Sequence, residues 1–423
     1  MRPPVHMLRG KFPFLEERRV TDIEWGESAP RGPGYLFEAN DGVVDLEYER
    51  HLRPTDLFVE SCVGFQSHRD HFVLSPSADA LRERIARFAN ADLVDAAKEF
   101  DLKDTRDWTI DGARKRLAAS DWSHSLTACA WRPFVNRQAA LTDALMDFPR
   151  DLLVGSFLRR RNMALCLPKA VPDNRFRHAQ MADLPVHDCY SSTKSGEAVH
   201  VFPAWLYTGR QGDLLAGGQT RASNLKPAFC ARLSALLGVP SVLERTGAAL
   251  DGFDPIDVQS YCYAVYHSQS YRLRYASQFK KGFARVPFPP TAEFFWALAG
   301  HGRRLTDLHL LRETAPTLAK FPEPGSNEIA KLKVEADGPA AKRIWINRTQ
   351  YFAGVQDLVW EHVVGAFQVL PKWLEWHREV DASFDPHEFL RVAGAIEATF
   401  PIVRAIDASI SAVRDRLWKG AAP

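Results

Sequence analysis

The chain has 423 residues, of which 46% are hydrophobic and 25% charged, and a formal net charge of +2. These values are ordinary for a protein that folds in water, and the length predicts two or three domains. They exclude a uniformly basic nucleic-acid binder, although a local basic footprint stays open. Six scattered cysteines without a C-x-x-C pair favour a reducing cytoplasm. No apolar run approaches the ~20 residues of a membrane helix, so we expect no membrane partner.

The first 125 residues are predicted to form a mixed α/β segment. Short strands and loops are expected over residues 1–75, with strand-like runs at 34–37 and 71–74. Ser77 is positioned to cap a helix over 78–100, whose apolar residues recur at helical spacing. A second helix is expected at 111–119.

Residues 126–250 are predicted to be rich in β-structure. Short apolar runs at 163–167 and 199–202 are separated by Pro, Asp, Asn and Ser, which is typical of strands joined by loops. A Gly-rich loop is expected next, at 208–223, followed by a helix at 225–237 and a connector at 238–254.

A helix rich in tyrosine opens the last segment, residues 251–423. Asp257 is its predicted N-cap, and Tyr261 and Tyr275 lie on one apolar face. The helix reaches a basic end at Lys280 and Lys281 and is followed by a proline-rich extended stretch. We interpret its aromatic face mainly as part of the protein core.

The rest of this segment is predicted to be helical with an inserted β-hairpin. Residues alternate in period two at 329–335 and 342–347 on either side of Asp-Gly-Pro, which predicts the hairpin. Further helices are expected at 358–378, kinked or restarted at Pro371, and at 386–417, capped by Asp385. The predicted fold class is therefore α+β, with segments at 1–125, 126–250 and 251–423 and a hairpin near 329–347.

No motif for catalysis or cofactor binding stands out. The G-x-x-x-x-G-K-[ST], G-x-G-x-x-G and G-x-S-x-G patterns are absent. Both Pro-Pro pairs lack the acid or amide and the aromatic residue with which adenine methyltransferases hold a flipped base. His68, Asp70 and His71 lack H-E-x-x-H spacing, so we interpret them as a surface turn. We expect no catalytic residue, no metal and no cofactor of the chain's own.

The sharpest candidate for a binding surface is the run Arg159, Arg160, Arg161 and Asn162, just before a predicted strand. Three adjacent guanidinium groups suit phosphate contacts, and Arg and Asn side chains can pair with guanine or adenine edges. A solvated charged turn is an equally good interpretation. Lys194, in a following loop rich in Ser and Thr, is predicted to extend the same face.

Two C-terminal groups complete the predicted DNA-binding residues. Lys280 and Lys281 form the basic end of the tyrosine-rich helix. Arg348 and Gln350 follow the second strand of the predicted hairpin, and both have side chains with the geometry for base edges. The alternative for the last pair is a turn stabilised by Asn and Thr.

Several runs of residues, in this order, resemble the C-terminal region of Type ISP restriction-modification enzymes. Those are polypeptides that join nuclease, translocase, adenine methyltransferase and target-recognition parts. The family reads Arg-Pro-Phe-Asp-x-Arg where residues 132–137 here read RPFVNR, which puts any role of the missing acid in doubt. The resembling runs are GYLF (34–37), GFQSHRDHFV (64–73), LKDTRDW (102–108), WRPF (131–134), NMALCLP (162–168), VFPAWLY (201–207), the tyrosine-rich helix with its exit (257–290), WINRTQYF (345–352) and GAFQVLPKWL (365–374).

The resemblance implies a target-recognition module, with residues 1–125 as the junction to a methyltransferase. Nuclease, motor and methyl-donor motifs are missing from this chain. The leading hypothesis is a DNA sequence-specificity module that binds double-stranded DNA without chemistry of its own. One alternative is a split or truncated adenine-specific DNA methyltransferase subunit, to which a partner core would bring S-adenosylmethionine. Another is a non-catalytic protein-interaction scaffold. A methyltransferase, translocase or nuclease subunit is the expected protein partner.

Overall fold

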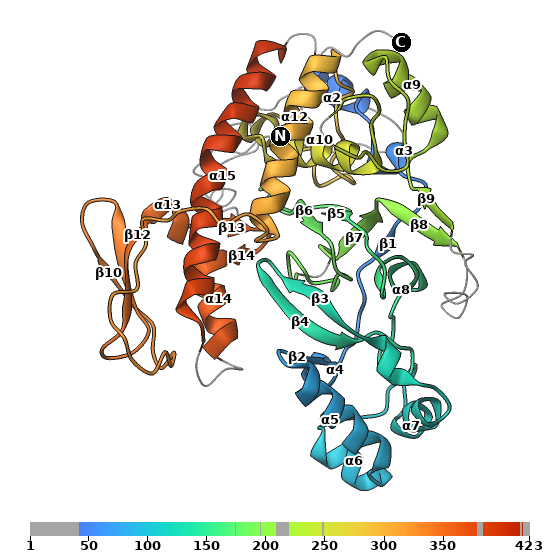
Figure 1. Cartoon of the computed structure of the whole chain (residues 1–423), viewed down its shortest axis with the longest axis vertical. Coiled ribbons are helices and arrows are strands. Elements are labelled where there is room, and N and C mark those ends of the chain that lie inside the picture. The colour runs from blue at the N-terminus through green and yellow to red at the C-terminus, as the bar shows by residue number, and fades with distance from the viewer. Residues whose placement is uncertain are drawn as a thin grey trace, which may run out of the picture.

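The computed structural model describes residues 42–173, 175–194, 196–208, 220–247, 249–378, 384–414 and 417. Helices and antiparallel sheets alternate along the chain, so the predicted α+β class is confirmed. A central sheet lies between a layer of helices and an N-terminal lobe, and a C-terminal lobe stands to one side (Figure 1). The predicted strand at 34–37 lies outside the described residues. Within them, no helix combines the length and apolar character that crossing a membrane requires.

The N-terminal lobe consists of short helices packed on a small sheet. Ser77 caps α5 as predicted, but the expected helix at 78–100 is two helices, because Asp92 caps a new one. The predicted strand at 71–74 is wrong. Phe72 belongs to a helical turn that packs its ring against Phe88. The elements of this lobe are α4 Asp70–Val73, β2 Leu74–Ser75, α5 Ala78–Asn90, α6 Leu93–Glu99, α7 Ile110–Ala118, η3 Trp122–Ser125, β3 Leu126–Arg132, β4 Val135–Ala140 and α8 Asp151–Phe157. The two helices that precede them, α2 Gly42–Glu49 and α3 Pro54–Leu57, lie with the layer of helices instead (Figure 1).

The central sheet has the strand order β1-β7-β5-β6 and confirms both predicted apolar strands. A second hairpin, β8–β9, forms at its side, so the expected loop at 208–223 is wrong for residues 208 and 220–223, which are strand. The helix expected at 225–237 is present as α9. These elements are β1 Cys62–Val63, β5 Ala164–Pro168, β6 Gln180–Ala182, β7 Val199–Pro203, β8 Trp205–Thr208, β9 Thr220–Ser223 and α9 Pro227–Leu237.

Both faces of the central sheet are buried, which explains why its strands read as unbroken apolar runs. In β5, Leu165 and Leu167 pack with the helical layer. Ala164 and Cys166 face the other way and pack with the N-terminal lobe. The central sheet therefore joins two hydrophobic cores. The core on the helical side contains residues from all three predicted segments, and the other core contains residues on both sides of residue 125. The division into three segments stays a prediction.

The helical layer is built from α10 Pro255–His267, α11 Gln269–Arg274, α12 Ala292–His309 and α15 Pro386–Ala412. Tyr261 and Tyr275 are buried, as predicted, but the expected single helix is wrong, because Ser268 ends α10 and caps α11. The predicted cap is wrong by one turn. Asp254 caps α10, and Asp257, at the third helical position, accepts a hydrogen bond from the backbone N–H of Asp254 to complete a capping box.

The C-terminal lobe contains the predicted hairpin, β10–β11, and a third strand, β12, beside it. The single helix expected at 358–378 is wrong, because the β13–β14 hairpin, whose strands have two residues each, divides it into α13 and α14. Gly365 at its turn has a φ of 56° and donates its N–H to the carbonyl of Arg177 at 2.7 Å. The elements are β10 Lys333–Ala336, β11 Ala341–Trp345, β12 Tyr351–Gln356, α13 Asp357–Trp360, β13 Val363–Val364, β14 Phe367–Gln368 and α14 Val369–Arg378.

Helices α10 and α12 approach so closely that one glycine is required between them. A Cβ atom added at Gly302 would lie 1.9 Å from the carbonyl oxygen of Ser260, whereas one added at Gly300 would meet nothing within 4 Å. Ser260 is completely buried, so the backbones have no room to separate without loss of packing.

We therefore expect Gly302→Ala to lower the free energy of unfolding by about 1–3 kcal/mol, because overpacking moves two helices apart. Gly300→Ala, two residues away on the exposed side, serves as the matched control. It should raise stability by up to ~1 kcal/mol, because alanine is the better helix former. Urea denaturation of both variants checks this. Equal stabilities of the two variants would contradict the close contact.

A buried polar chain crosses the same helices. The Tyr263 hydroxyl lies 2.5 Å from Nδ1 of His309, whose Nε2 lies 2.9 Å from the Thr399 hydroxyl. Thr399 donates to the carbonyl of Ala395 at 2.8 Å, so His309 donates from Nε2 and accepts at Nδ1 as a neutral ring. Burial, reinforced by the nearby side chains of His362 and Arg272, lowers the pKa of His309 to about 3.

This pKa predicts a loss of stability in mild acid. The unfolded state binds a proton below about pH 6.5, whereas the folded ring stays neutral until about pH 3. The contribution of His309 to stability is therefore full above pH 6.5 and falls as the pH drops toward 3, by up to ~1.4 kcal/mol per pH unit. The variant His309→Gln should show a correspondingly flatter dependence between pH 4 and 6.5 in urea titrations. An unchanged slope would mean that this ring is protonated in the folded state.

Candidate nucleic-acid interface

Arg159, Arg160 and Arg161 form the turn between α8 and β5, which we call the arginine turn. Arg159 has a φ of 57°, and the side chains of Arg159 and Arg161 are exposed. Arg160 is half-buried, with its guanidinium 4.9 Å from the ring centre of Tyr207 and a hydrogen bond to the carbonyl of Gly155. The turn thus presents three cations on one short stretch of backbone, as predicted.

The β8–β9 hairpin adds a fourth arginine beside this turn. The Arg221 guanidinium lies 4.4 Å from the ring centre of Trp205 and pairs with Glu244 at 2.5 Å. Arg161 also approaches Glu244, at 3.4 Å, and the Tyr207 hydroxyl donates to the Arg161 carbonyl at 2.5 Å. One carboxylate therefore holds two guanidinium groups, and the surface keeps a local excess of positive charge.

A pocket of about 280 Å³ opens next to the arginine turn, between the central sheet and α12. Arg161 shares its wall with two arginines from distant parts of the chain, Arg303 and Arg312. Arg303 pairs with Asp257 at 2.7 Å and Arg312 with Asp183 at 2.5 Å. Sequence patterns did not indicate these two arginines, because Arg303 has only Arg304 beside it, Arg312 stands alone, and only the fold brings them to the turn.

Asn162 is not available at the surface, so its predicted role in contacting DNA is corrected. Its side chain is 3% exposed. The amide nitrogen donates to the carbonyls of Ser156 at 3.0 Å and Trp205 at 2.8 Å, and the amide oxygen accepts from the N–H groups of Met163 and Trp205. Asn162 therefore joins the end of α8 to the starts of β5 and β8.

Gln350 is corrected for the same reason. It is fully buried, and its amide nitrogen donates to the Glu323 carbonyl at 3.1 Å and to the Asn327 side chain at 2.8 Å. Its oxygen accepts from the Asn327 N–H at 2.9 Å. The other candidate of this loop, Arg348, is exposed.

Lys194 lies apart from the arginine turn. The turn precedes the first residue of β5, whereas Lys194 pairs at 3.5 Å with Asp173, beyond the last residue of that strand. Five strand residues span roughly 16 Å, so the two groups occupy opposite ends of the central sheet. Lys194 therefore does not extend the face of the arginine turn.

The two lysines after α11 share the far end of the sheet with Lys194. The carbonyl of Phe279 accepts from the N–H of Val171, which fixes Lys280 and Lys281 near the segment that follows β5. Both lysines are exposed, and Lys281 lies 4.0 Å from Asp45. The predicted cations thus fall into three places: the arginine turn, the far end of β5, and the loop of Arg348.

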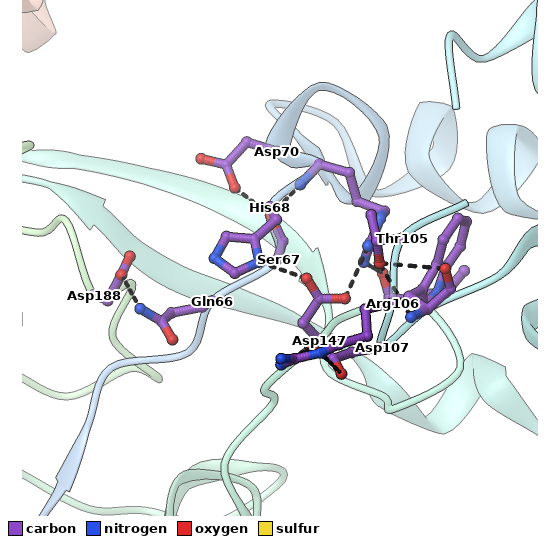
Figure 2. Close-up of polar contacts among 12 residues, drawn as sticks. Gln66, Ser67, His68, Asp70, Thr105, Arg106, Asp107, Asp147 and Asp188 are labelled. Atoms are coloured by element: carbon purple, nitrogen blue, oxygen red, sulfur yellow. Dashed lines mark hydrogen bonds and ion pairs between the residues drawn. The ribbon is translucent and has the colours of Figure 1, made fainter. Parts of the chain in front are cut away.

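The loop that contains His68 is a rigid junction (Figure 2). His68 has a φ of 54°, and its Nδ1 lies 2.5 Å from Asp147, which also accepts from buried Arg69 at 2.8 Å. His71 lies 3.1 Å from the carbonyl of Phe100. One ring nitrogen of each histidine thus has a protein partner, which agrees with a structural turn.

Behind this loop, the ring of His187 ties the N-terminal lobe to the central sheet. His187 lies 3.0 Å from Asp70 and 3.1 Å from Asp188. Asp188 also accepts from Gln66 at 2.7 Å (Figure 2). Burial alone would lower the pKa of His187, but hydrogen bonds to Asp188 and Asp70 outweigh it and raise the pKa to about 10. The donor atoms of His187, Asp188 and Cys189 lie within 4.8 Å of one another. Because the ring of His187 contacts both carboxylates, we interpret this group as an ionic link between the lobe and the sheet.

The buried amide of Asn162 generates a stability prediction. Asn162→Ala would leave four backbone groups without partners, so we expect it to lower the free energy of unfolding by about 2–4 kcal/mol. Arg161→Ala, at the neighbouring exposed residue, should change it by less than ~0.5 kcal/mol. Urea denaturation compares the two. A stable Asn162→Ala variant with weaker DNA binding would restore Asn162 to the candidate contacts.

Solved structures share this fold. A cryo-electron microscopy structure of a DrdV–DNA complex matches with a TM-score of 0.67 and 20% identity, covering 94% of this chain and 42% of that chain. The ATP-dependent Type ISP restriction-modification enzyme LlaBIII bound to DNA matches with a TM-score of 0.66 and 15% identity, covering 90% and 25%. A nuclease-deletion mutant of the Type ISP restriction-modification enzyme LlaGI in complex with a DNA substrate mimic matches with a TM-score of 0.62 and 17% identity, covering 92% of this chain and 36% of that chain. The chain therefore spans less than half the length of each.

Sequence comparison identifies the family. No match was found among curated proteins. Residues 56–391 match the model of the Type ISP C-terminal specificity domain, a range that includes the arginine turn, the central sheet and the C-terminal lobe. The resemblance predicted from the ordered runs of residues is confirmed, and the chain belongs to the family of Type ISP C-terminal specificity domains.

Proposed function

We propose that this chain is the DNA sequence-specificity module of a restriction-modification or DNA-methylation system and binds double-stranded DNA without chemistry of its own. The observation that carries the proposal is the arginine turn, which stands exposed in a chain of the Type ISP specificity family. The similar structures named above contain DNA, which supports the same partner here.

The geometry of the arginine turn suits the DNA backbone. Guanidinium groups bind phosphate oxygens through paired hydrogen bonds, and Arg159 and Arg161 present theirs to solvent. Arg160 and Arg221 are pre-ordered by stacking on Tyr207 and Trp205. Ordered side chains lose less conformational entropy on binding. Such contacts fix position on the duplex, while sequence is read by contacts to base edges elsewhere.

Methylation and cleavage would come from outside this chain. It has no nucleotide-binding or methyl-donor motif, and it spans only 42%, 25% and 36% of the three longer chains that share its fold. The second candidate, which the family match supports as well, is a split or truncated adenine-specific DNA methyltransferase subunit that needs a partner core. A partner core would then bind S-adenosylmethionine, and this chain would choose the site. Methyltransferase, translocase and nuclease parts are the partners that both versions require.

The salt dependence of binding tests the arginine turn. We expect the triple variant Arg159→Ala, Arg160→Ala, Arg161→Ala to bind DNA with a weaker salt dependence. The magnitude of the slope of log K against log salt should fall by about 2–3, because each lost phosphate contact lowers that magnitude by about 0.9. The readout is fluorescence anisotropy with a labelled duplex at several salt concentrations.

A second triple variant provides the matched control. Arg82, Arg106 and Arg116 are exposed on the N-terminal lobe, and their replacement by alanine changes the net charge equally. This control should retain most of the slope. Equal slopes for the two triple variants would refute a specific footprint at the arginine turn. Salt-independent binding by the unmodified chain would refute phosphate contact altogether, and absence of duplex binding would favour the protein-interaction scaffold.

A further inference from the structure

A large hollow lies where the β3–β4 turn and the end of α12 meet the C-terminal half of α14 and the start of α15. It has a volume of about 600 Å³ and adjoins a smaller cavity of about 50 Å³. The two share four wall residues, Phe134, Asn136, Leu310 and Leu311. We call the pair the interlobe hollow, because one wall belongs to the N-terminal lobe and another to the C-terminal lobe.

Two residues of the shared wall have unusual backbone conformations. Phe134 has a φ of 62° and Leu311 a φ of 53°, and both have bulky side chains. A bulky residue in the left-handed region costs free energy and persists only where its surroundings impose that conformation. Such residues gather at functional sites. Two of them facing one hollow therefore mark it as more than a packing gap.

Both walls of the hollow are fixed by contacts between the lobes. Arg137 donates to the carbonyl of Trp376 at 3.3 Å, and the Trp131 and Trp376 rings meet edge to face with centres 5.6 Å apart. On the other side, Arg391 donates to the carbonyl of Leu311 at 2.7 Å. A side chain on this wall is thus held in a defined position before any ligand arrives.

Asn136 is the residue that these walls present to solvent. It is exposed, whereas its neighbours Val135 and Arg137 are only 3% and 8% exposed. Its amide makes no hydrogen bond within the described part of the chain, in contrast to Asn162 and Gln350, whose amides are consumed by internal contacts. A carboxamide whose donor and acceptor are both unused can pair with an adenine edge in the major groove, and the strand that carries Asn136 is fixed by its buried neighbours Val135 and Arg137.

We propose that Asn136 is a specificity-determining residue that reads an adenine of the target site from the interlobe hollow. This inference rests on the proposed function. The amide N–H would donate to adenine N7 and the amide oxygen would accept from the adenine N6 amino group. The arginine turn then supplies affinity, and the interlobe hollow supplies sequence preference.

Selection from random duplexes tests the assignment, with the full chain and its Asn136→Ala variant in parallel. The unmodified chain should enrich a motif that contains adenine at one position where the variant shows no preference. A bidentate contact predicts a loss of discrimination of about 5- to 150-fold there. The salt slope should stay unchanged, since no phosphate contact is removed. Asn90→Ala, an exposed asparagine on α5, is the matched control and should keep the full motif.

The outcomes separate this inference from the proposed function. An identical motif for the unmodified chain and Asn136→Ala overturns the role of Asn136 and leaves the proposed function intact. A uniform loss of affinity with the motif retained also overturns it, because the residue would then support binding and not reading. If the unmodified chain enriches no motif, the proposed function itself fails. Thermal unfolding of each variant confirms that the exposed substitution leaves the fold unchanged.

Discussion

Burial of α10 on every side is the constraint on which the rest of the structure depends. All its residues except Ile256 are buried, including three that are polar or charged in its first two turns, Asp257, Gln259 and Ser260. Tyrosine satisfies this constraint better than phenylalanine. The hydroxyls of Tyr261 and Tyr266 donate to the carbonyls of Pro287 and Ala284, in an extended segment that has no strand partner along most of its length. The helix thereby supplies the hydrogen bonds that this buried backbone would otherwise lack.

The same helix holds the central sheet in place. Gln259, fully buried, donates to the carbonyl of Phe202 at the end of β7, and the sheet side chains interleave with the tyrosine rings. Because β5 is fixed from that side, the arginine turn at its start has a fixed position too. The pocket beside the turn and the interlobe hollow both include Asp183 in their walls. The pocket beside the proposed backbone contacts therefore adjoins the hollow of the proposed reading residue at Asp183.

Sequence patterns predicted the features that depend on neighbouring residues. The cap at Ser77, the β10–β11 hairpin and the buried tyrosine face each follow from a few residues close together in the chain. The break between α13 and α14 could not be predicted, because it depends on Arg177 and Ser191, far away in the sequence. Asn162 and Gln350 have the side chains of base readers, but only the fold shows that their amides are already bonded. Sequence patterns did not indicate Asn136, because a single asparagine outside any motif has no feature that marks it as a base contact.

The turn of β13–β14 attaches the C-terminal lobe to the central sheet through main-chain atoms. Gly365 and Ala366 donate their N–H groups to the carbonyls of Arg177 and Ser191, at 2.7 and 2.9 Å. A Cβ at Gly365 would lie 1.8 Å from the Ser191 oxygen, so this glycine alone cannot be exchanged. The other side chains of this turn take no part in these two main-chain hydrogen bonds. The exposed surface of the lobe can therefore be redesigned for new targets, as long as the glycine and the contacts of Trp376 with Trp131 and Arg137 are kept.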